Sequence, residues 1–524
     1  MPNKKNKLGF DNDCRNIKNQ VISLGKLVQK YPNDPVIYGN FIRMKKLFKR
    51  TVKRKYRETK NRLMNKIIQA EVDNPKEFWK LLSKLKNNRD LGSSPISLND
   101  WSEYFCSLHN NSLAKNCDEK FIDAVHNRLN ILLKIDKKGD PFGQNISIDE
   151  FRETVKKLKS NKSCGPDGIS NEMIKSGMIQ LSNCILKLFD MILLTESTPD
   201  EWATSFIVPL HKGGTDTVPS NYRGLSVTSC LGKLFSAILN NRLSKSIEEN
   251  NMLSNAQIGF KKHKRTSDHI FVLKSIIEQC KSRRKPIYAC FVDLKKAYDT
   301  VWREGLFFKL LHNYNVSPIF VRILDSMYKN IRGTVKMDGI LGSLFDITIG
   351  LRQGCNLSPQ LFNLYIDDLA KLLDRISNDP VTLNGINIPC LLYADDMLLL
   401  STTKSGLQKS LTALEIYCDK WQLVVNTTKT KIMVFNNTSK PEFHYKGENL
   451  EVVEEYTYLG LLIHKSGNFT KAIKDLAMRA RRAFYSLKYM LKECAVSPKL
   501  FMKLFDSLVR PILLYCSEVW GDFP

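Results

Sequence analysis

The sequence predicts a mixed fold of helices and short strands, with a helical extension at its amino end. Residues 287–292, and the two runs that flank Asp395 and Asp396, are short and almost wholly apolar, which is typical of largely buried strands. Apolar residues recur at helical spacing from about Asp299 onward and again along 468–493. Short buried strands among longer amphipathic helices indicate an α+β fold.

Asp395 and Asp396 form an acidic pair at a bend between two apolar runs. Charges that leave water are costly unless something neutralises them, and hard divalent cations such as Mg²⁺ favour carboxylate oxygen. The alternative is an ordinary hairpin turn, in which Asp is common. Taken alone, the pair favours a metal site only slightly.

Asp293 is a third carboxylate in similar surroundings, because it stands at the end of the strand predicted over 287–292. If this strand lies beside those around Asp395 and Asp396, the three carboxylates converge on one point. Such a cluster suits two metal ions, roughly 3.5–4 Å apart, that promote an in-line phosphoryl displacement. We expect Asp299, by contrast, to be the N-cap of the helix that follows, which is a structural role.

These residues carry a resemblance to a known family. Tyr-Ala-Asp-Asp at 393–396, with Asp293 in Phe-Val-Asp-Leu-Lys-Lys-Ala-Tyr-Asp, resembles the catalytic core of reverse transcriptases, and most closely the polymerases of non-LTR retrotransposons, the long interspersed elements. An ordered series of motifs is specific where a lone Asp-Asp is not. Further segments resemble that group's other motifs in the family's order: Asn161–Ile174, Pro209–Lys212, Asn221–Ser226, Gly350–Pro359, Asn426–Lys429 and Tyr456–Gly460.

The resemblance implies a right-hand polymerase fold, with fingers, a palm built on an antiparallel sheet, and a helical thumb. It implies an RNA-directed DNA polymerase that extends a primer 3′-hydroxyl with deoxynucleotides on an RNA template, using two Mg²⁺ ions for which Mn²⁺ could substitute. Asp293 and Asp395 would be the principal metal ligands. Asp396 would be a supporting ligand, and Leu294 would complete the metal site through its backbone.

The resemblance also assigns residues to the incoming nucleotide. Lys212 and Arg223 would reach it from a two-stranded finger, since Arg suits bidentate phosphate contact and Lys acts as a point charge. Lys295 and Lys296 lie in the turn after the predicted strand, where backbone N–H groups commonly bind phosphate. In a chain with 80 lysines and arginines, only their position in the motifs distinguishes these residues.

Tyr298 would pack under the sugar and reject a 2′-hydroxyl, although a buried core tyrosine is the competing interpretation. Gln353 would contact the template or the incoming base. Lys429 is a candidate general acid for pyrophosphate release, with a solvated loop lysine as the alternative. The remaining motif resembles the primer grip, for which we name Tyr458, Leu459 and Gly460.

The charge of the chain favours a polyanionic partner. The formal net charge is +27 with a pI near 9.4, which points to nucleic acid before membrane. Residues 1–90 hold 24 Lys and Arg against 8 Asp and Glu. Part of this excess lies in the run Lys49–Arg57, within sequence that looks helical over Phe41–Ala70. A solvated helix face and a nuclear-localisation patch are the alternatives to an RNA- or DNA-binding extension.

The 13 cysteines form no Cys-x-x-Cys, and the 8 histidines have no metal-ligand spacing with them, so we predict neither zinc nor a disulfide framework. The amino terminus lacks an apolar signal core, and no apolar run approaches the roughly 20 residues of a membrane span. We therefore expect no membrane partner and a soluble, intracellular protein, in the nucleus, the cytoplasm or both, as a ribonucleoprotein. The oligomeric state is not predicted.

We expect four regions: a basic helical extension over 1–95, a helical connector over 96–146, fingers and palm over 147–466, and a thumb over 467–524. The thumb would contain the helix of 468–493, whose basic residues lie mostly outside its apolar stripe. Nothing in the sequence resembles the endonuclease that such elements often carry, and relatives usually continue beyond this thumb. The apolar stripe of the helix predicted over 468–493 comprises Ile473, Leu476, Ala480, Phe484, Leu487 and Leu491.

Two other functions compete with reverse transcription. One is a catalytically silent nucleic-acid-binding remnant or repurposed copy of such an element, which the joint presence of the site residues disfavours. The other is an RNA-directed RNA polymerase, whose palm uses related carboxylates. Ala394 before the acidic pair and Tyr298 below the sugar disfavour the second alternative.

Overall fold

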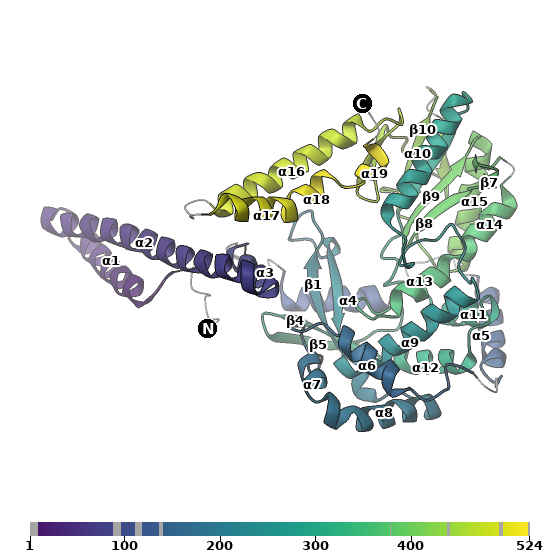
Figure 1. The fold of residues 1–524 in the computed structure, drawn as a ribbon, viewed down its shortest axis with the longest axis horizontal. Helices are drawn as coiled ribbons and strands as arrows, with labels where there is room; N and C mark the ends of the chain where they lie inside the picture. Colours follow the sequence, from purple (N-terminus) through teal and green to yellow (C-terminus); the bar gives the residue numbers. More distant parts are fainter. Residues whose placement is uncertain are drawn as a thin grey trace. The chain divides into compact units, whose positions relative to one another are not determined.

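The computed structural model describes residues 9–86, 96–110, 118–135, 140–377, 379–437, 441–491 and 496–521. These residues form two compact units. The first combines 1–93 with 472–517, and the second combines 94–471 with 518–524. Helices and sheets are both present, with helices alone at the two ends of the chain, so the predicted α+β mixture is confirmed (Figure 1).

The first unit is helical. Its longest helix, α2, begins with Pro35 after an N-cap at Asp34, whose carboxylate accepts from the backbone N–H groups of Val36 and Ile37. This helix contains the whole of the segment 41–70 for which the sequence predicted a helix. The helices of this unit are α1 (Asn12–Lys30), α2 (Pro35–Asp73), α3 (Pro75–Lys86), most of α16 (Thr470–Leu491), α17 (Pro498–Leu508) and α18 (Arg510–Leu513).

The hydrophobic core of the first unit is built from both ends of the chain. Residues of α2 and α3, such as Ile67 and Phe78, share one buried cluster with Leu487 of α16 and Leu500 and Leu504 of α17. The apolar stripe predicted for the helix of 468–493 is the buried face of α16. The amino-terminal extension and the carboxy-terminal helices therefore stabilise each other by sharing this core.

The second unit opens with helices that pack on its main core. They are α4 (Leu98–Asn110), α5 (Glu119–Leu132), α6 (Ile148–Lys157), α7 (Asn171–Ser176), α8 (Met178–Thr195) and the short 3₁₀ helix η1 (Asp200–Trp202). With 18 residues, α8 is the one helix of the described chain long and apolar enough to cross a membrane, which departs from the prediction that no segment approaches such a length. One such helix is weak evidence for a membrane span; α8 buries Phe189 and Ile192 in the core, and 22% of its residues are buried.

A first sheet has the strand order β2-β1-β4-β5, with β1 antiparallel to β2 and parallel to β4. In the β1–β2 hairpin Leu210 pairs with Arg223. Because the chain continues from β2 into α9 through an N-cap at Ser229, this hairpin is anchored at its base. The elements are β1 (Thr204–His211), the 3₁₀ helix η2 (Pro219–Asn221), β2 (Tyr222–Val227), α9 (Cys230–Glu249), β4 (Arg332–Met337) and β5 (Ile340–Asp346).

A second sheet, of order β10-β3-β9-β8, is antiparallel throughout. Strand β3 (Ile287–Val292) is buried along its whole length, as predicted from its unbroken apolar run. It lies between β10 (Lys431–Phe435) and β9 (Asp396–Ser401), and β8 (Cys390–Tyr393) forms the edge. The strands predicted on either side of the acidic pair are thus confirmed.

Helices and short hairpins complete the second unit around this sheet (Figure 1). The helices are α10 (Thr266–Ser282), α11 (Arg303–His312), α12 (Pro318–Tyr328), α13 (Ser358–Ile366), α14 (Asp368–Ile376), α15 (Lys404–Lys420) and α19 (Ser517–Trp520), which begins in the first unit. The hairpins pair β6 (Thr382–Leu383) with β7 (Ile386–Asn387), β11 (His444–Tyr445) with β12 (Glu448–Asn449), and β13 (Glu455–Tyr458) with β14 (Leu461–His464).

A buried lysine connects four of these helices. Lys309 of α11 is fully buried, and its ammonium donates to the Tyr365 carbonyl of α13 at 2.5 Å, to Asp368 Oδ1 of α14 at 2.7 Å and to the Tyr417 hydroxyl of α15 at 2.7 Å. The ring of Trp421 lies 3.8 Å from the same nitrogen. Burial lowers the pKa of Lys309 to about 8 despite the nearby Asp368, so the side chain remains charged at neutral pH.

The expectation that Asp299 caps a helix is wrong. Helix α11 begins only at Arg303, its N-cap position is Trp302, and residues 295–300 form turns. Asp299 is almost completely buried, and its carboxylate accepts a hydrogen bond from the side-chain amide of Gln353. The sequence pattern could not show this contact, because its two partners are 54 residues apart in the chain.

Candidate active site

The second sheet brings Asp293, Asp395 and Asp396 to one end of its central strands. Val292 pairs with Met397 across β3 and β9, so Asp293 follows one member of this pair and Asp396 precedes the other. Asp395 lies in the two-residue turn between β8 and β9, where Tyr393 pairs with Asp396. Residues more than a hundred positions apart in the sequence therefore meet at one end of the strands of one sheet.

The turn that carries Asp395 is held in an uncommon backbone conformation. Ala394 has φ +55°, in the left-handed region that non-glycine residues rarely adopt. The side chain of Gln257, which is fully buried, accepts from the backbone N–H of Ala394 at 3.1 Å and from that of Gly259 at 2.9 Å. A Cβ at Gly259 would lie 2.5 Å from the Ala394 nitrogen, so glycine is required for this approach. Sequence reasoning missed Gln257 and Gly259, because no local pattern marks a contact over 137 residues.

The electrostatics of the three carboxylates reveal their proximity. Removal from water, followed by the negative charges of Asp395 and Asp293, raises the pKa of Asp396 to about 6. A cation placed among these groups would relieve the repulsion, so their chemistry fits a divalent metal ion. Among the residues that the structure describes, no three acidic, histidine or cysteine side chains are arranged to hold a metal as they stand. The metal ligands therefore remain a prediction.

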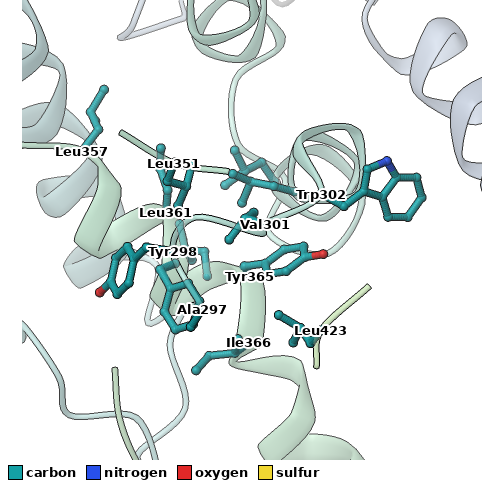
Figure 2. Close-up of a cluster of buried hydrophobic side chains, with 14 of the residues drawn as sticks. Ala297, Tyr298, Val301, Trp302, Leu351, Leu357, Leu361, Tyr365, Ile366 and Leu423 are labelled. Carbon is teal, nitrogen blue, oxygen red and sulfur yellow. The ribbon is translucent and has the colours of Figure 1, made fainter. Parts of the chain in front are cut away.

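The loop after β3 is anchored in the hydrophobic core. Figure 2 shows Ala297, Tyr298 and Val301 of this loop in one buried cluster with Leu361 and Tyr365 of α13. The backbone between Asp293 and this cluster is therefore fixed by packing on the core.

The backbone of this loop is also bonded to the chain before β10. Asp293 O accepts from Asn426 N at 2.7 Å, and Lys295 N donates to Val424 O at 2.8 Å. An isolated bridge pairs Leu294 with Val425. Leu294 is buried next to Asp293, and its metal role stays a prediction.

The β1–β2 hairpin places two cations near the carboxylates. Lys212 lies directly after β1, and Arg223 lies in β2. Burial lowers the pKa of Lys212, as do the positive charges of Arg223 and Lys296, while the negative charge of Asp395 opposes this shift. The structure therefore brings Lys212 close enough to both Arg223 and Asp395 for their charges to act on it.

Gln353 joins this hairpin to the loop after β3. Its side-chain oxygen accepts from Arg223 Nε, and its side-chain nitrogen donates to the Asp299 carboxylate. Its backbone oxygen accepts from Ser226 N at 2.9 Å. Gln353 is thus buried and bonded at both ends, and contact with a template or base through this side chain would require one of these bonds to open.

Tyr298 combines the two interpretations that the sequence left open. It is a buried residue whose ring stacks on Phe362 with centroids 4.6 Å apart, and the Arg223 guanidinium lies 5.8 Å from the same ring. Its hydroxyl finds no hydrogen-bond partner within the described part of the chain. Burial, followed by the charge of Asp395, raises the pKa of this hydroxyl, so Tyr298 is both a core residue and a neighbour of the catalytic candidates.

The two lysines of the loop differ. Lys295 is exposed, whereas the Lys296 ammonium donates to the backbone oxygens of Ser220 and Tyr222 at 3.2 and 3.1 Å. Lys296 therefore holds the start of β2 against the loop. A role in nucleotide binding would require it to exchange these acceptors for phosphate.

Lys429 and the primer-grip candidates approach the site from the other side of β3. Lys429 is exposed in the turn after Asn426, which is bonded to Asp293. Tyr458 ends β13 and is buried, and its hydroxyl has no partner among the described residues. Leu459 and Gly460 have φ +46° and +86°, as a tight two-residue hairpin turn requires.

Arg303 is a further residue that sequence reasoning missed. Its guanidinium donates to the carbonyls of Gly350, Ile349, Ile347 and Tyr328 at 2.9 to 3.2 Å. Burial lowers its pKa to about 10. Arg303 thereby fixes the segment that leads into Gln353, and its position at the start of α11 gave no signal of this role.

Residues 210–463 match the model of the family described as "Reverse transcriptase (RNA-dependent DNA polymerase)". This segment is a reverse transcriptase domain. It contains Asp293, Asp395, Asp396 and every other predicted site residue, so the resemblance to reverse transcriptases is confirmed at the level of the family.

Polymerases of non-LTR mobile elements are similar to the reverse transcriptase domain and its flanks. The chain is 26% identical over 388 residues to the probable RNA-directed DNA polymerase from transposon BS of Drosophila melanogaster, covering 72% of this chain and 42% of the relative. It is 26% identical over 389 residues to the RNA-directed DNA polymerase from mobile element jockey of Drosophila funebris, covering 72% and 41%. A Pol polyprotein from retrotransposable element R2 of Nasonia vitripennis is 28% identical over 342 residues, covering 62% and 31%. The chain thus spans less than half the length of these relatives.

Proposed function

We propose that this chain is an RNA-directed DNA polymerase of a non-LTR retrotransposon, which extends a primer 3′-hydroxyl with deoxynucleotides on an RNA template. The observation that carries the proposal is the meeting of Asp293, Asp395 and Asp396 at one end of β3, β9 and β8, within a reverse transcriptase domain. The proposal includes the right-hand arrangement of fingers, palm and thumb, with the boundaries predicted at 95, 146 and 466.

Each residue of the proposed site would have a separate role in the reaction. Asp293 and Asp395 would hold two Mg²⁺ ions, with Asp396 and the Leu294 backbone in support, and the ions would activate the primer hydroxyl and stabilise departing pyrophosphate. Lys212 and Arg223 would bind the triphosphate from the hairpin. Tyr298 would limit the space below the sugar.

The roles of Lys429 as general acid and of Tyr458, Leu459 and Gly460 as primer grip belong to the same proposal. The exposed basic residues of α2 and α16 would bind the nucleic-acid backbone, because Lys and Arg neutralise phosphates irrespective of sequence. A soluble ribonucleoprotein inside the cell would be the working form.

Primer extension tests this function. A DNA primer on an RNA template is incubated with deoxynucleotides or with ribonucleotides, using the wild type, Asp395→Asn, and Asp338→Asn as a matched exposed turn aspartate. We expect DNA product from the wild type and the control, and a loss of at least 100-fold in Asp395→Asn, because the change removes a charge from the proposed metal site. Chelation should abolish the activity, and Mg²⁺ or Mn²⁺ should restore it.

Each of the other outcomes would contradict the proposal. RNA product with ribonucleotides would identify an RNA polymerase. Tight binding of the primer–template without extension, in a preparation with a cooperative unfolding transition, would identify a silent nucleic-acid-binding protein. Equal activity in the Asp395→Asn variant would place the chemistry elsewhere.

A further inference from the structure

Asp299 lies where the loop after β3 packs against the segment that leads into Gln353. Leu351 N donates to Tyr298 O at 2.7 Å, and Gly350 N donates to Val301 O at 2.9 Å. A Cβ at Gly350 would lie 2.3 Å from the Asp299 backbone oxygen. The two segments therefore touch along their backbones, which leaves Asp299 no freedom to move away from Gln353.

Two consecutive side-chain hydrogen bonds connect Asp299 to the β1–β2 hairpin. The Asp299 carboxylate accepts from Gln353 Nε2, and Gln353 Oε1 accepts from Arg223 Nε. Asp299 is 5% exposed and Gln353 is 8% exposed, so little water competes for these bonds. The two bonds connect a buried carboxylate to an arginine that faces the site.

The chemistry of Asp299, Gln353 and Arg223 allows only one orientation of the hydrogen bonds between them. An ionised carboxylate only accepts, a guanidinium only donates, and an amide does both. Burial raises the pKa of Asp299 to about 6, against the positive charges of Lys296, Arg223 and Lys212, so the carboxylate is ionised at neutral pH. Gln353 must then turn its NH₂ group to Asp299 and its oxygen to Arg223. Without Asp299 the NH₂ group loses its acceptor, so only the bond from Arg223 would orient the amide and the side chain would be held less firmly.

We propose that Asp299 is a positioning residue for nucleotide binding, which acts through Gln353 to hold the Arg223 guanidinium toward the triphosphate of the incoming deoxynucleotide. This inference rests on the proposed function. The terminal nitrogens of Arg223 make no hydrogen bond to any residue that the structure describes, so they remain available for phosphate oxygens. Asp299 itself lies behind Gln353 and contacts no substrate.

Steady-state primer extension with a varied deoxynucleotide concentration tests the role of Asp299. We expect Asp299→Ala to raise the KM for the deoxynucleotide about tenfold while kcat changes less than threefold, since the nucleotide is bound less well but the metal ligands are intact. Asp299→Asn retains an oxygen that can accept from Gln353, although it also permits the reversed amide, and should raise KM about threefold. Asp149→Ala, an exposed aspartate on α6, is the matched control and should leave both constants unchanged.

The decisive comparison is made in a Gln353→Ala background. If Asp299 acts through Gln353, Asp299→Ala adds less than twofold to KM once Gln353 is absent, because coupled residues are not additive. Should Asp299→Ala fail to fold, Asp299→Asn carries the same comparison, with its threefold effect vanishing in the Gln353→Ala background.

Two outcomes would overturn the inference while the proposed function stands. One is a KM effect of Asp299 that multiplies in full with that of Gln353→Ala. The other is an unchanged KM with a lower unfolding midpoint, as a purely structural residue would give. An inactive wild type, in contrast, would contradict the proposed polymerase itself.

Discussion

Substituting Lys309 tests how helices α11, α13, α14 and α15 are held together. Replacing it by Met keeps the length of the side chain and fills the same volume, so no cavity should form. The change removes the ammonium that donates to the Tyr365 carbonyl, to Asp368 and to the Tyr417 hydroxyl. It leaves Asp368 without its cation.

The expected loss in the free energy of unfolding depends on the interactions that Asp368 retains. Removing one member of a buried ion pair typically costs about 3–5 kcal/mol, because the other charge is left buried. The Asp368 side chain is 22% exposed and still accepts from Tyr417, so water and this hydroxyl can replace part of the loss. We therefore expect Lys309→Met to lower the free energy of unfolding by about 3 kcal/mol, at the lower end of that range.

Equilibrium unfolding in urea, followed by circular dichroism, measures this difference. The double variant Lys309→Met with Asp368→Asn should recover most of the loss, to within about 1 kcal/mol of the wild type, since no charge is then stranded. Lys431→Met breaks the pair with Glu451, whose side chain is 65% exposed, and as a control should cost about 1 kcal/mol or less. A loss below 1 kcal/mol for Lys309→Met, or a double variant as unstable as the single one, would refute the reasoning.

Three further predictions concern other parts of the chain. Burial lowers the pKa of His269 to about 4 from an unfolded value of 6.5. The neutral form therefore stabilises the fold above pH 6.5, and this stability is lost as the pH falls. Between pH 7.5 and 5.0 the free energy of unfolding in urea should fall by about 2 kcal/mol more for the wild type than for His269→Leu, and parallel pH profiles would contradict this. Gly350→Ala should cost about 3 kcal/mol in thermal unfolding, from its φ of +84° and the contact with Asp299, whereas Gly385→Ala, with φ +81° in open space, should cost about 1 kcal/mol; equal costs would exclude the contact as the cause. Changing Lys49, Arg50, Lys53 and Arg54 of α2 to Gln should reduce the slope of log affinity for single-stranded RNA against log salt by about 3, as measured by filter binding from 50 to 200 mM salt, and an unchanged slope would remove α2 from the RNA-binding surface.

The sequence alone indicated strands β3, β8 and β9 and the three candidate carboxylates. Strand β3 was predictable because an unbroken apolar run of six residues is buried on both faces, and this period can be read along the chain. The acidic residues stood out because two apolar runs enclosed Asp395 and Asp396 and a third ended at Asp293. Helix α16 was predictable for the same kind of reason, since its apolar residues recur at helical spacing, and the basic segment 41–70 of α2 also looked helical.

The roles of several polar residues were decided only by the tertiary structure. Asp299 had the local pattern of a helix cap, yet its carboxylate bonds to Gln353, and α11 begins four residues later. Gln257 and Arg303 had no pattern at all, although the first holds the turn at Ala394 and the second fixes the segment before Gln353.

The physical reason for this division is the range of the interactions. Burial of an apolar face imposes a period on neighbouring residues, so the sequence records it locally. A buried polar group needs only one matched partner, and that partner can come from any part of the chain that the fold brings near. The carboxylates, the strands beside them and the basic helices could therefore be read from the sequence. The hydrogen-bonded residues that hold the carboxylates and the arginine in place became visible only when distant segments were packed together.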